Sequence, residues 1–201
     1  MVTSWQVFGD VHERVAARIF EWGADPVVDV GGGYGRLVEA LPAGMTGIVV
    51  DNSRTQLAGA RGARILADAV RLPLRDGCAG AVTALWMLYH LDEPEQAVVE
   101  AWRVLRPGGW FIASTSSRRN DPELTDGYPP TTFDAEDAEQ IVRRVFTDVI
   151  VERWDAPMIR LPDREAVLLY CRSHHLKAEA AERVRPPVWL TKRGCLIYAR
   201  R

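Results

Sequence analysis

The sequence predicts an α/β protein built on a doubly wound, mostly parallel sheet with helices on both faces. Two observations predict it. Short apolar runs alternate with amphipathic stretches along most of the 201 residues, and the first apolar run leads directly into a cluster of glycines. Hydrophobic residues make up 47% and charged residues 26% of the chain, which is enough apolar material for one full core. We therefore expect a single domain over residues 1–201.

Apolar periodicity and turn residues place the elements up to the fifth strand. Asp10 is a suitable N-cap for the first helix. In chain order, we expect a helix over 10–22, a strand over 27–30, a helix over 36–41, a strand over 47–51, a helix over 56–61, strands over 64–66 and 79–85, a helix over 94–105, a turn over 106–109 and a strand over 110–114.

The pattern changes after the fifth strand. Residues 116–132 are polar and rich in Pro, Gly and Asp, which predicts a long surface loop on the substrate side. Residues 162–187 predict a helical insert before the last strand, which either covers the active site or decorates the surface. The remaining expected elements are a helix over 134–146, a strand over 148–154, helices over 163–172 and 177–184, and a strand or hairpin over 188–200.

Composition excludes several classes of partner. The net charge of −2 provides no basic field for nucleic acid. No apolar run approaches the roughly 20 residues of a membrane span. Residues 1–10 lack a basic stretch followed by an apolar one, so we expect no secretory signal and a cytoplasmic protein. The sequence leaves the oligomeric state open.

Cysteine and histidine spacing predicts no metal site. Cys78, Cys171 and Cys195 are far apart and form no CxxC pair. The pair His174–His175 has no partners at metal-ligand spacing, so we interpret it as structural or exposed. The pairs at 118–119 and 143–144 are arginines that could hold an acidic substrate, although isolated pairs of this kind are more often solvated.

A glycine turn after the first strand is the sharpest signal in the sequence. A dinucleotide fold with G-x-G-x-x-G would place Arg36 where the third glycine is needed for close helix–strand packing. A phosphate-binding P-loop would require a Lys that does not follow here. What remains is G-x-G-x-G, which lets a ligand approach the backbone closely. The turn consists of Gly31, Gly32, Gly33, Tyr34 and Gly35.

This segment resembles the cofactor loop of the class I S-adenosylmethionine-dependent methyltransferases. The resemblance extends over 27–114 and includes the Leu-Arg-Pro-Gly-Gly turn at 105–109. It implies a Rossmann-like sheet of seven strands with an antiparallel C-terminal strand. It also implies S-adenosylmethionine as the cofactor and S-adenosylhomocysteine as the product.

The resemblance assigns cofactor-binding residues at four strand ends. It places Asp29 and the glycine turn beside the methionine portion. The other assigned residues are Asp51 and Asn52 for the ribose, Asp68 and Ala69 for the adenine edge, and Trp86 and Met87 for the sulfonium side.

Structural interpretations of the same residues stay open. Asp51, Asn52 or Ser53 could instead cap the following helix, and Asp68 could make a turn bond. Trp86 and Met87 could simply pack in the core.

Methyl transfer needs a base only when the nucleophile must lose a proton. His90 is the first candidate for a base, followed by His12 and then Tyr128; His90 could equally be structural. We expect the acceptor to lie near Tyr89, His90, Arg118 and Tyr128. The expected function is methyl transfer to an O, N or C nucleophile of a small molecule. The alternatives are an RNA or protein methyltransferase, or a non-catalytic S-adenosylmethionine-binding module.

Overall fold

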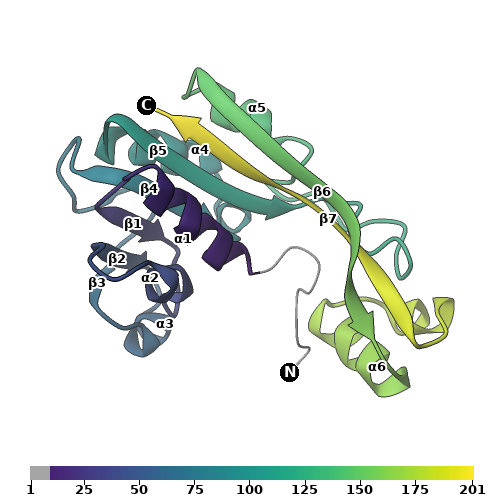
Figure 1. Cartoon of the computed structure of the whole chain (residues 1–201). Helices are drawn as coiled ribbons and strands as arrows, with labels where there is room; N and C mark the ends of the chain where they lie inside the picture. The colour runs from purple at the N-terminus through teal and green to yellow at the C-terminus, as the bar shows by residue number, and fades with distance from the viewer. Residues whose placement is uncertain (1–9) are drawn as a thin grey trace.

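The computed structural model describes residues 10–201, and the expectation about a signal segment lies in residues outside this range. The described residues form a seven-stranded sheet in the order β3-β2-β1-β4-β5-β7-β6 (Figure 1). β1 to β5 run parallel, and β7 is antiparallel to both of its neighbours. The predicted fold class is confirmed. The strands are β1 (Val27–Val30), β2 (Gly47–Asp51), β3 (Ala63–Leu66), β4 (Ala79–Leu85), β5 (Leu105–Ser116), β6 (Asp148–Leu161) and β7 (Val188–Arg200).

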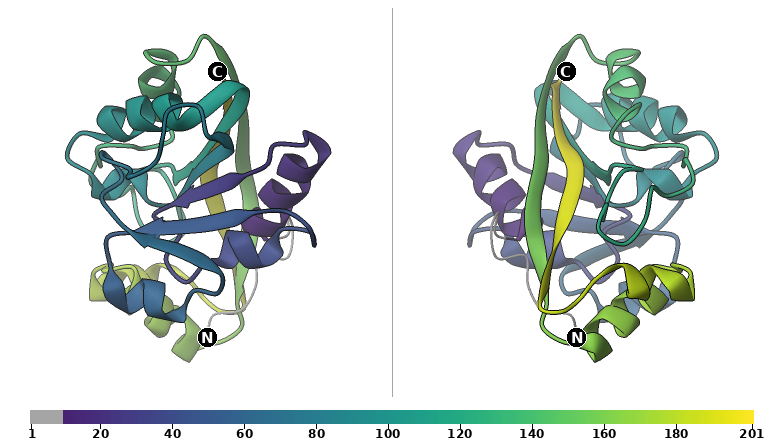
Figure 2. Two further views of the ribbon diagram at one scale, coloured as in Figure 1. Left: turned by 90° about the vertical axis from the view of Figure 1, so that its left-hand side faces the viewer. Right: turned by 90° about the vertical axis from the view of Figure 1, so that its right-hand side faces the viewer.

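Helices cover both faces of the sheet (Figure 2). Side chains of α1 and α2 share one apolar cluster with one face of the central strands, and those of α4 and α5 share a second cluster with the other face. None of the helices in the described part is long and apolar enough to cross a membrane. The helices are α1 (Val11–Glu21), α2 (Arg36–Ala40), α3 (Arg54–Gly59), η1 (Leu88–His90), α4 (Pro94–Val104), α5 (Ala138–Arg143), α6 (Arg164–Ser173) and η2 (Ala178–Arg183).

Two-sided burial explains why the central strands are continuous apolar runs. Val27 packs in the cluster under α1, whereas its neighbour Val28 packs under α4, because successive side chains point to opposite faces. Every residue of β4 is buried, as expected for a parallel strand covered by helices on both sides.

The sequence signals at helix starts agree with the structure. The Asp10 carboxylate accepts a hydrogen bond from the backbone N–H of His12 at 2.8 Å and caps α1. Asp163 caps α6 in the same way through the N–H of Ala166, also at 2.8 Å. Each bond satisfies an N–H group that has no partner within its helix.

The elements after β5 differ most from expectation. The α-helix expected over 134–146 is α5, which spans only Ala138–Arg143, and the helix expected over 177–184 is the 3-10 helix η2. The strand expected over 148–154 continues to Leu161, because β6 pairs with β7 along its whole length. The insert, residues 162–187, therefore lies at the far end of a long two-stranded ribbon (Figure 1).

The segment 116–132 is not simply a surface loop. Asp121 is fully buried, and Leu124 packs in a small apolar cluster with Leu161 of β6 and Tyr170 of α6. The β6–β7 ribbon and α6 cover part of this segment, although its polar composition predicts that it is exposed to solvent. This correction follows from tertiary packing, which no local pattern reports.

Candidate active site

The glycine turn lies at the carboxyl end of β1, beside the point where the strand order reverses between β1 and β4. Gly31, Gly33 and Gly35 have φ values of +65°, +54° and +81°, which only glycine adopts readily. A Cβ on Gly31 would lie 2.7 Å from Cγ of Met87. Backbone conformation and close packing therefore both require glycine at this position.

Asp51 ends β2 and holds the glycine turn in place. Its Oδ2 accepts a hydrogen bond from the N–H of Gly33 at 2.9 Å, and its Oδ1 accepts one from the N–H of Ser53 at 2.8 Å. The side chain that caps α3 is Ser53, whose Oγ accepts from the N–H of Gln56 at 3.3 Å. Of the three capping candidates, Ser53 takes the role, so the Asp51 carboxylate stays at the turn.

Asp29 lies beneath the turn rather than in the cleft above it. It is 3% exposed, and the hydroxyl of Thr83 donates to its Oδ1 at 2.7 Å. Burial, assisted by the nearby charge of Asp51, raises the pKa of Asp29 to about 7. A Cβ on Gly32 would collide with this carboxylate. Asp29 therefore supports the turn from inside the protein.

A cleft of about 250 Å³ opens between the glycine turn, the end of β2 and η1. Seven of the residues predicted for the cofactor line it: Gly31, Asp51, Asn52, Asp68, Ala69, Trp86 and Met87. Asp29, Gly32, Gly33, Tyr34 and Gly35 are not among its lining residues. Ser53 and Gln56 also line the wall and were not predicted there, although Ser53 directly follows Asn52 and Gln56 lies one turn further along α3.

For Trp86 and Met87 the sequence left open whether they contact the cofactor or pack in the core, and the structure places them in the cleft wall as well as in packing contacts. Met87 is buried in the core cluster and also lines the cleft. Trp86 has a left-handed φ of +57°, and its ring meets that of Trp154 edge to face at 5.9 Å. This conformation turns the chain at the end of β4 and places the Trp86 side chain in the cleft wall.

A second cleft of about 350 Å³ shares Trp86 with the first. We call it the acceptor cleft, because it contains Tyr89, one of the residues near which the sequence predicts the acceptor. A shallower hollow of about 220 Å³, which contains Arg118 and Tyr128, shares Tyr89, Ser116, Asn120 and His174 with it. The acceptor cleft is lined by Asp10, Val11, His12, Arg36, Trp86, Tyr89, Ser116, Asn120, Ile159, His174 and Lys192.

Comparison with known proteins agrees with this geometry. Residues 28–113 match the family model for a methyltransferase domain. The chain is similar to this family over residues 28–113, which is less than half of its 201 residues. The matched range starts in β1 and ends in β5, so it contains all the strand ends that surround the first cleft.

Curated relatives are similar to parts of the chain. A malonyl-[acyl-carrier protein] O-methyltransferase of Marinomonas sp. is 27% identical over 162 residues, covering 75% of this chain and 58% of the relative. A ubiquinone/menaquinone biosynthesis C-methyltransferase of Acidiphilium cryptum is 35% identical over 103 residues, covering 51% of this chain and 41% of the relative. The chain thus spans about half the length of these curated relatives.

A solved structure shows the same fold over nearly the whole chain. It is a SAM-dependent methyltransferase from Archaeoglobus fulgidus, with a TM-score of 0.64 and 18% identity, covering 96% of this chain and 95% of the other. The likeness therefore includes the strands that follow the matched family segment.

The three side chains predicted as candidate bases lie in different surroundings. His90 is exposed at the end of η1, and its ring lies 4.4 Å from that of Tyr89. His12 is hydrogen-bonded through Nδ1 to Asp10 at 2.7 Å. The hydroxyl of Tyr128 donates to Asp121 at 2.7 Å, and burial raises the pKa of Tyr128, so this phenol stays protonated at neutral pH.

Arg118 is enclosed by carboxylates. It forms ion pairs with Asp134 at 3.3 Å, Glu136 at 3.6 Å and Asp137. These partners hold the side chain at the base of the 116–132 segment. The guanidinium is therefore less available to an acceptor than its sequence position predicts.

His174 is a site residue that the sequence analysis missed. It lines both the acceptor cleft and the adjoining hollow. Its Nδ1 lies 3.0 Å from the carbonyl oxygen of Tyr170, an acceptor, so this nitrogen carries the proton and Nε2 has the free lone pair. Burial lowers the pKa of His174. No sequence signal marks it, because only the docking of α6 brings it to the cleft.

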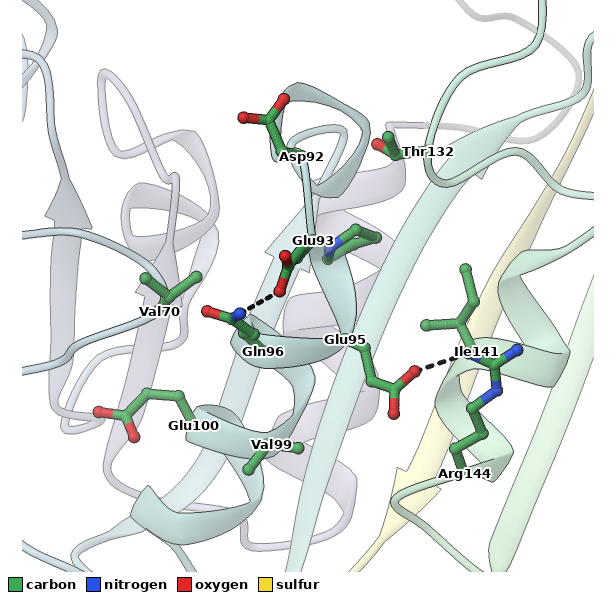
Figure 3. Close-up of a pocket in the computed structure, with 11 residues that line it drawn as sticks. Val70, Asp92, Glu93, Glu95, Gln96, Val99, Glu100, Thr132, Ile141 and Arg144 are labelled. Atoms are coloured by element: carbon green, nitrogen blue, oxygen red, sulfur yellow. Dashed lines mark hydrogen bonds and ion pairs between the residues drawn. The ribbon is translucent and has the colours of Figure 1, made fainter.

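Within residues 10–201, no group of three or more His, Cys, Asp or Glu side chains could hold a metal ion. A hollow of about 750 Å³ lies between α4 and α5, and none of the predicted site residues lines it (Figure 3). Two polar pairs are formed within it, Gln96 with Glu93, and Arg144 with Glu95 at 2.7 Å. Most of the predicted site residues instead line the two clefts that share Trp86 and the adjoining hollow.

Proposed function

We propose that the chain transfers a methyl group from S-adenosylmethionine to an oxygen, nitrogen or carbon nucleophile of a small molecule. One observation carries the proposal: the cleft beside the glycine turn and the acceptor cleft share a wall at Trp86. A methyl donor in the first and an acceptor in the second would meet at this residue. Alignment of the two reactants is the main contribution that a protein makes to such a displacement.

The residues of the first cleft fit the cofactor. Each oxygen of Asp51 accepts one backbone N–H and keeps capacity for a ribose hydroxyl. At Gly31 the absence of a Cβ leaves backbone next to the cleft, suited to the methionine portion. Asp68 and Ala69 offer a carboxylate and a backbone amide to the adenine edge.

The bound cofactor supplies an activated methyl group, so the protein needs no nucleophile of its own. Trp86 presents an aromatic surface suited to a positively charged sulfonium. If the acceptor must lose a proton, His90, at the edge of the first cleft, is our proposed base. Asp29 is assigned to supporting the turn.

A small-molecule acceptor is favoured over RNA by the net charge of −2. The relatives described above are named for malonyl-[acyl-carrier protein] and quinone substrates. We assign the chain to the same broad class of acceptor without choosing among oxygen, nitrogen and carbon.

Calorimetric titration with S-adenosylmethionine, S-adenosylhomocysteine and NADH tests the cofactor. We expect both sulfur compounds to bind the parent and NADH not to bind. Gly33→Val should abolish their binding, because it adds a branched side chain at φ +54° beside Gln56. Binding of NADH alone would overturn the proposal.

A methyl-transfer screen with labelled cofactor, across metabolite pools and total RNA, tests the acceptor. Label in a small molecule supports the proposal, and label in RNA alone refutes the acceptor class. Tight cofactor binding without transfer to any acceptor would favour a non-catalytic binding module.

A further inference from the structure

A buried lysine lies in the wall of the acceptor cleft. The chain has only two lysines, Lys177 and Lys192, among its 25 Lys and Arg residues. Lys177 is exposed, whereas Lys192 on β7 is 5% exposed. Burying an ammonium group is costly unless partners replace its water. The residues around Lys192 therefore have to replace the hydrogen bonds that water would make.

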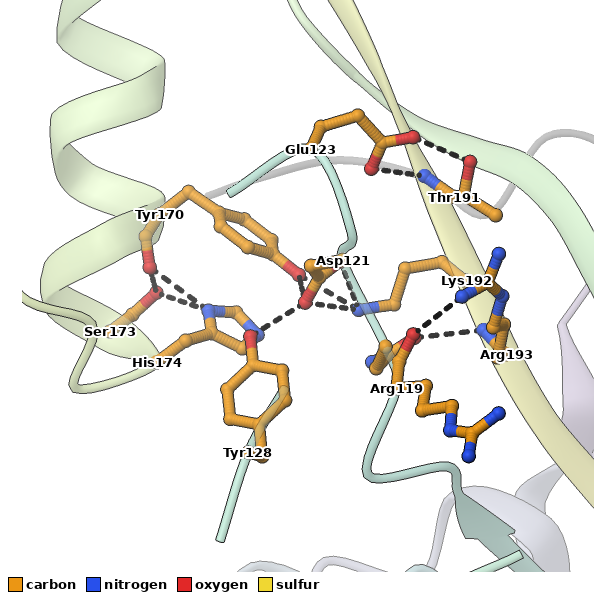
Figure 4. Close-up of polar contacts among 11 residues, drawn as sticks. Arg119, Asp121, Glu123, Tyr128, Tyr170, Ser173, His174, Thr191, Lys192 and Arg193 are labelled. Carbon is orange, nitrogen blue, oxygen red and sulfur yellow. Dashed lines mark hydrogen bonds and ion pairs between the residues drawn. The ribbon is translucent and has the colours of Figure 1, made fainter. Parts of the chain in front are cut away.

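The partners of Lys192 form a compact network (Figure 4). Nζ of Lys192 donates to Oδ1 and Oδ2 of Asp121 at 2.9 and 3.1 Å, and to the hydroxyl oxygen of Tyr170 at 2.8 Å. The hydroxyls of Tyr170 and Tyr128 donate to Oδ2 of Asp121 at 2.9 and 2.7 Å. The network joins β7, α6 and the 116–132 segment.

Of the two charged residues in the network, only one lines the acceptor cleft. The Asp121 carboxylate is fully buried and surrounded by donors, and it is not a lining residue. Lys192 is the member of the pair that lines the cleft. The positively charged residue of the pair therefore borders the cleft, and the negatively charged one does not.

The other charged groups around the cleft do not cancel this polarity. Asp10 is the acidic residue of the wall, and its carboxylate already accepts hydrogen bonds from His12 and Arg36. His174 exposes a neutral imidazole there. Within the described residues, the charged side chains of the wall, Asp10, Arg36 and Lys192, are thus all paired, and Lys192 is the one whose counter-charge lies outside the wall.

We propose that Lys192 determines acceptor specificity by selecting molecules with an anionic oxygen, a carboxylate or phenolate, on an aromatic or apolar body. The body would pack against Trp86, Tyr89 and Ile159, which line the same cleft. Attraction between the ammonium charge and the anion supplies the selection, because a neutral isostere such as an amide can accept a hydrogen bond through its carbonyl oxygen but carries no charge. The inference rests on the proposed function in calling this cleft the acceptor site.

Binding of matched probes tests the inference. Benzoate and neutral benzamide are titrated into protein saturated with S-adenosylhomocysteine, with 4-nitrophenolate as the phenolate probe. We expect the parent to bind benzoate or 4-nitrophenolate at least about tenfold more tightly than benzamide. Lys192→Met should remove the preference, and the matched control Lys177→Met should keep it.

A second measurement locates the contact. With only two lysines, protein labelled with ¹³C at lysine Cε gives one signal from each. An anionic probe should shift the Lys192 signal and leave that of Lys177 in place. The size of the shift with each probe distinguishes a carboxylate from a phenolate ligand.

Three outcomes would overturn the inference: no anion preference in the parent, an unchanged preference in Lys192→Met, or no binding of either anion at millimolar concentration. If Lys192→Met fails to fold, the double variant Lys192→Met/Asp121→Asn is used in its place. This double variant removes both charges of the buried pair. Failure of S-adenosylhomocysteine to bind, with the anion preference intact, would refute the proposed function and leave the anion site standing.

Discussion

The carboxylate of Asp51 accepts a hydrogen bond from the backbone N–H of Gly33 at 2.9 Å, across 18 residues of sequence. The bond joins the end of β2 to the turn after β1, so one side chain both shapes the turn and lines the cleft. Loss of the carboxylate should therefore affect the turn and any bound ribose together.

Asp51→Ala should weaken binding of S-adenosylhomocysteine by about 1.5–3 kcal/mol, on the order of 10- to 100-fold, because charged hydrogen bonds are lost. Asp51→Asn should lose less, since it keeps one oxygen acceptor. Calorimetry measures both, with Asp126→Ala as the control, because the Asp126 side chain is 92% exposed on the 116–132 segment. An unchanged affinity in Asp51→Ala would place the cofactor elsewhere.

Alanine substitutions at two glycines, Gly23 and Gly31, allow the cost of backbone strain to be measured apart from the cost of a steric clash. Gly23 and Gly31 have similar φ values of +59° and +65°, yet a Cβ meets nothing within 4 Å at Gly23 and Met87 at 2.7 Å at Gly31. Gly23→Ala should lower the unfolding free energy by about 1–2 kcal/mol from backbone strain alone. Gly31→Ala should cost more and also weaken S-adenosylhomocysteine binding. Urea denaturation and calorimetry check both, and equal effects of the two variants would contradict the assigned close contact.

Asp29 should make stability depend on pH. With a pKa raised to about 7, the folded protein holds a proton that the unfolded chain releases near pH 4. The contribution of this group is full below about pH 4 and falls as pH rises through about 7. Between pH 6 and pH 8 the parent should lose about 1.4 kcal/mol of unfolding free energy that Asp29→Asn does not lose. Urea unfolding of both proteins at these pH values measures the difference, and parallel curves would contradict it.

The Asp121–Lys192 pair should behave as a coupled unit. Asp121→Asn leaves a buried ammonium without its counter-charge and should cost about 3–5 kcal/mol of stability, as should Lys192→Met for the converse reason. The double variant should cost less than the sum. A double-mutant cycle from denaturation curves gives the coupling energy, and simple additivity would show that the pair contributes no net interaction.

The sequence by itself determined the side of the site that we propose for the cofactor. Gly31 and Asp51 each follow a short buried strand, and the carboxyl ends of parallel strands meet at one edge of a sheet. Local order along the chain is therefore enough to predict that these residues converge. Glycines at positive φ and a carboxylate at a strand end are chemical signals that need no knowledge of distant packing.

Only the tertiary structure decided the side of the site that we propose for the acceptor. Asp121 and Lys192 are 71 residues apart, and they meet because β6 and β7 form a long ribbon whose far end packs against α6 and the 116–132 segment. The same packing brings His174 to the cleft. Composition marks Asp121 and Lys192 as polar and solvent-facing, and burial reverses that assignment because their partners come from elements far apart in sequence.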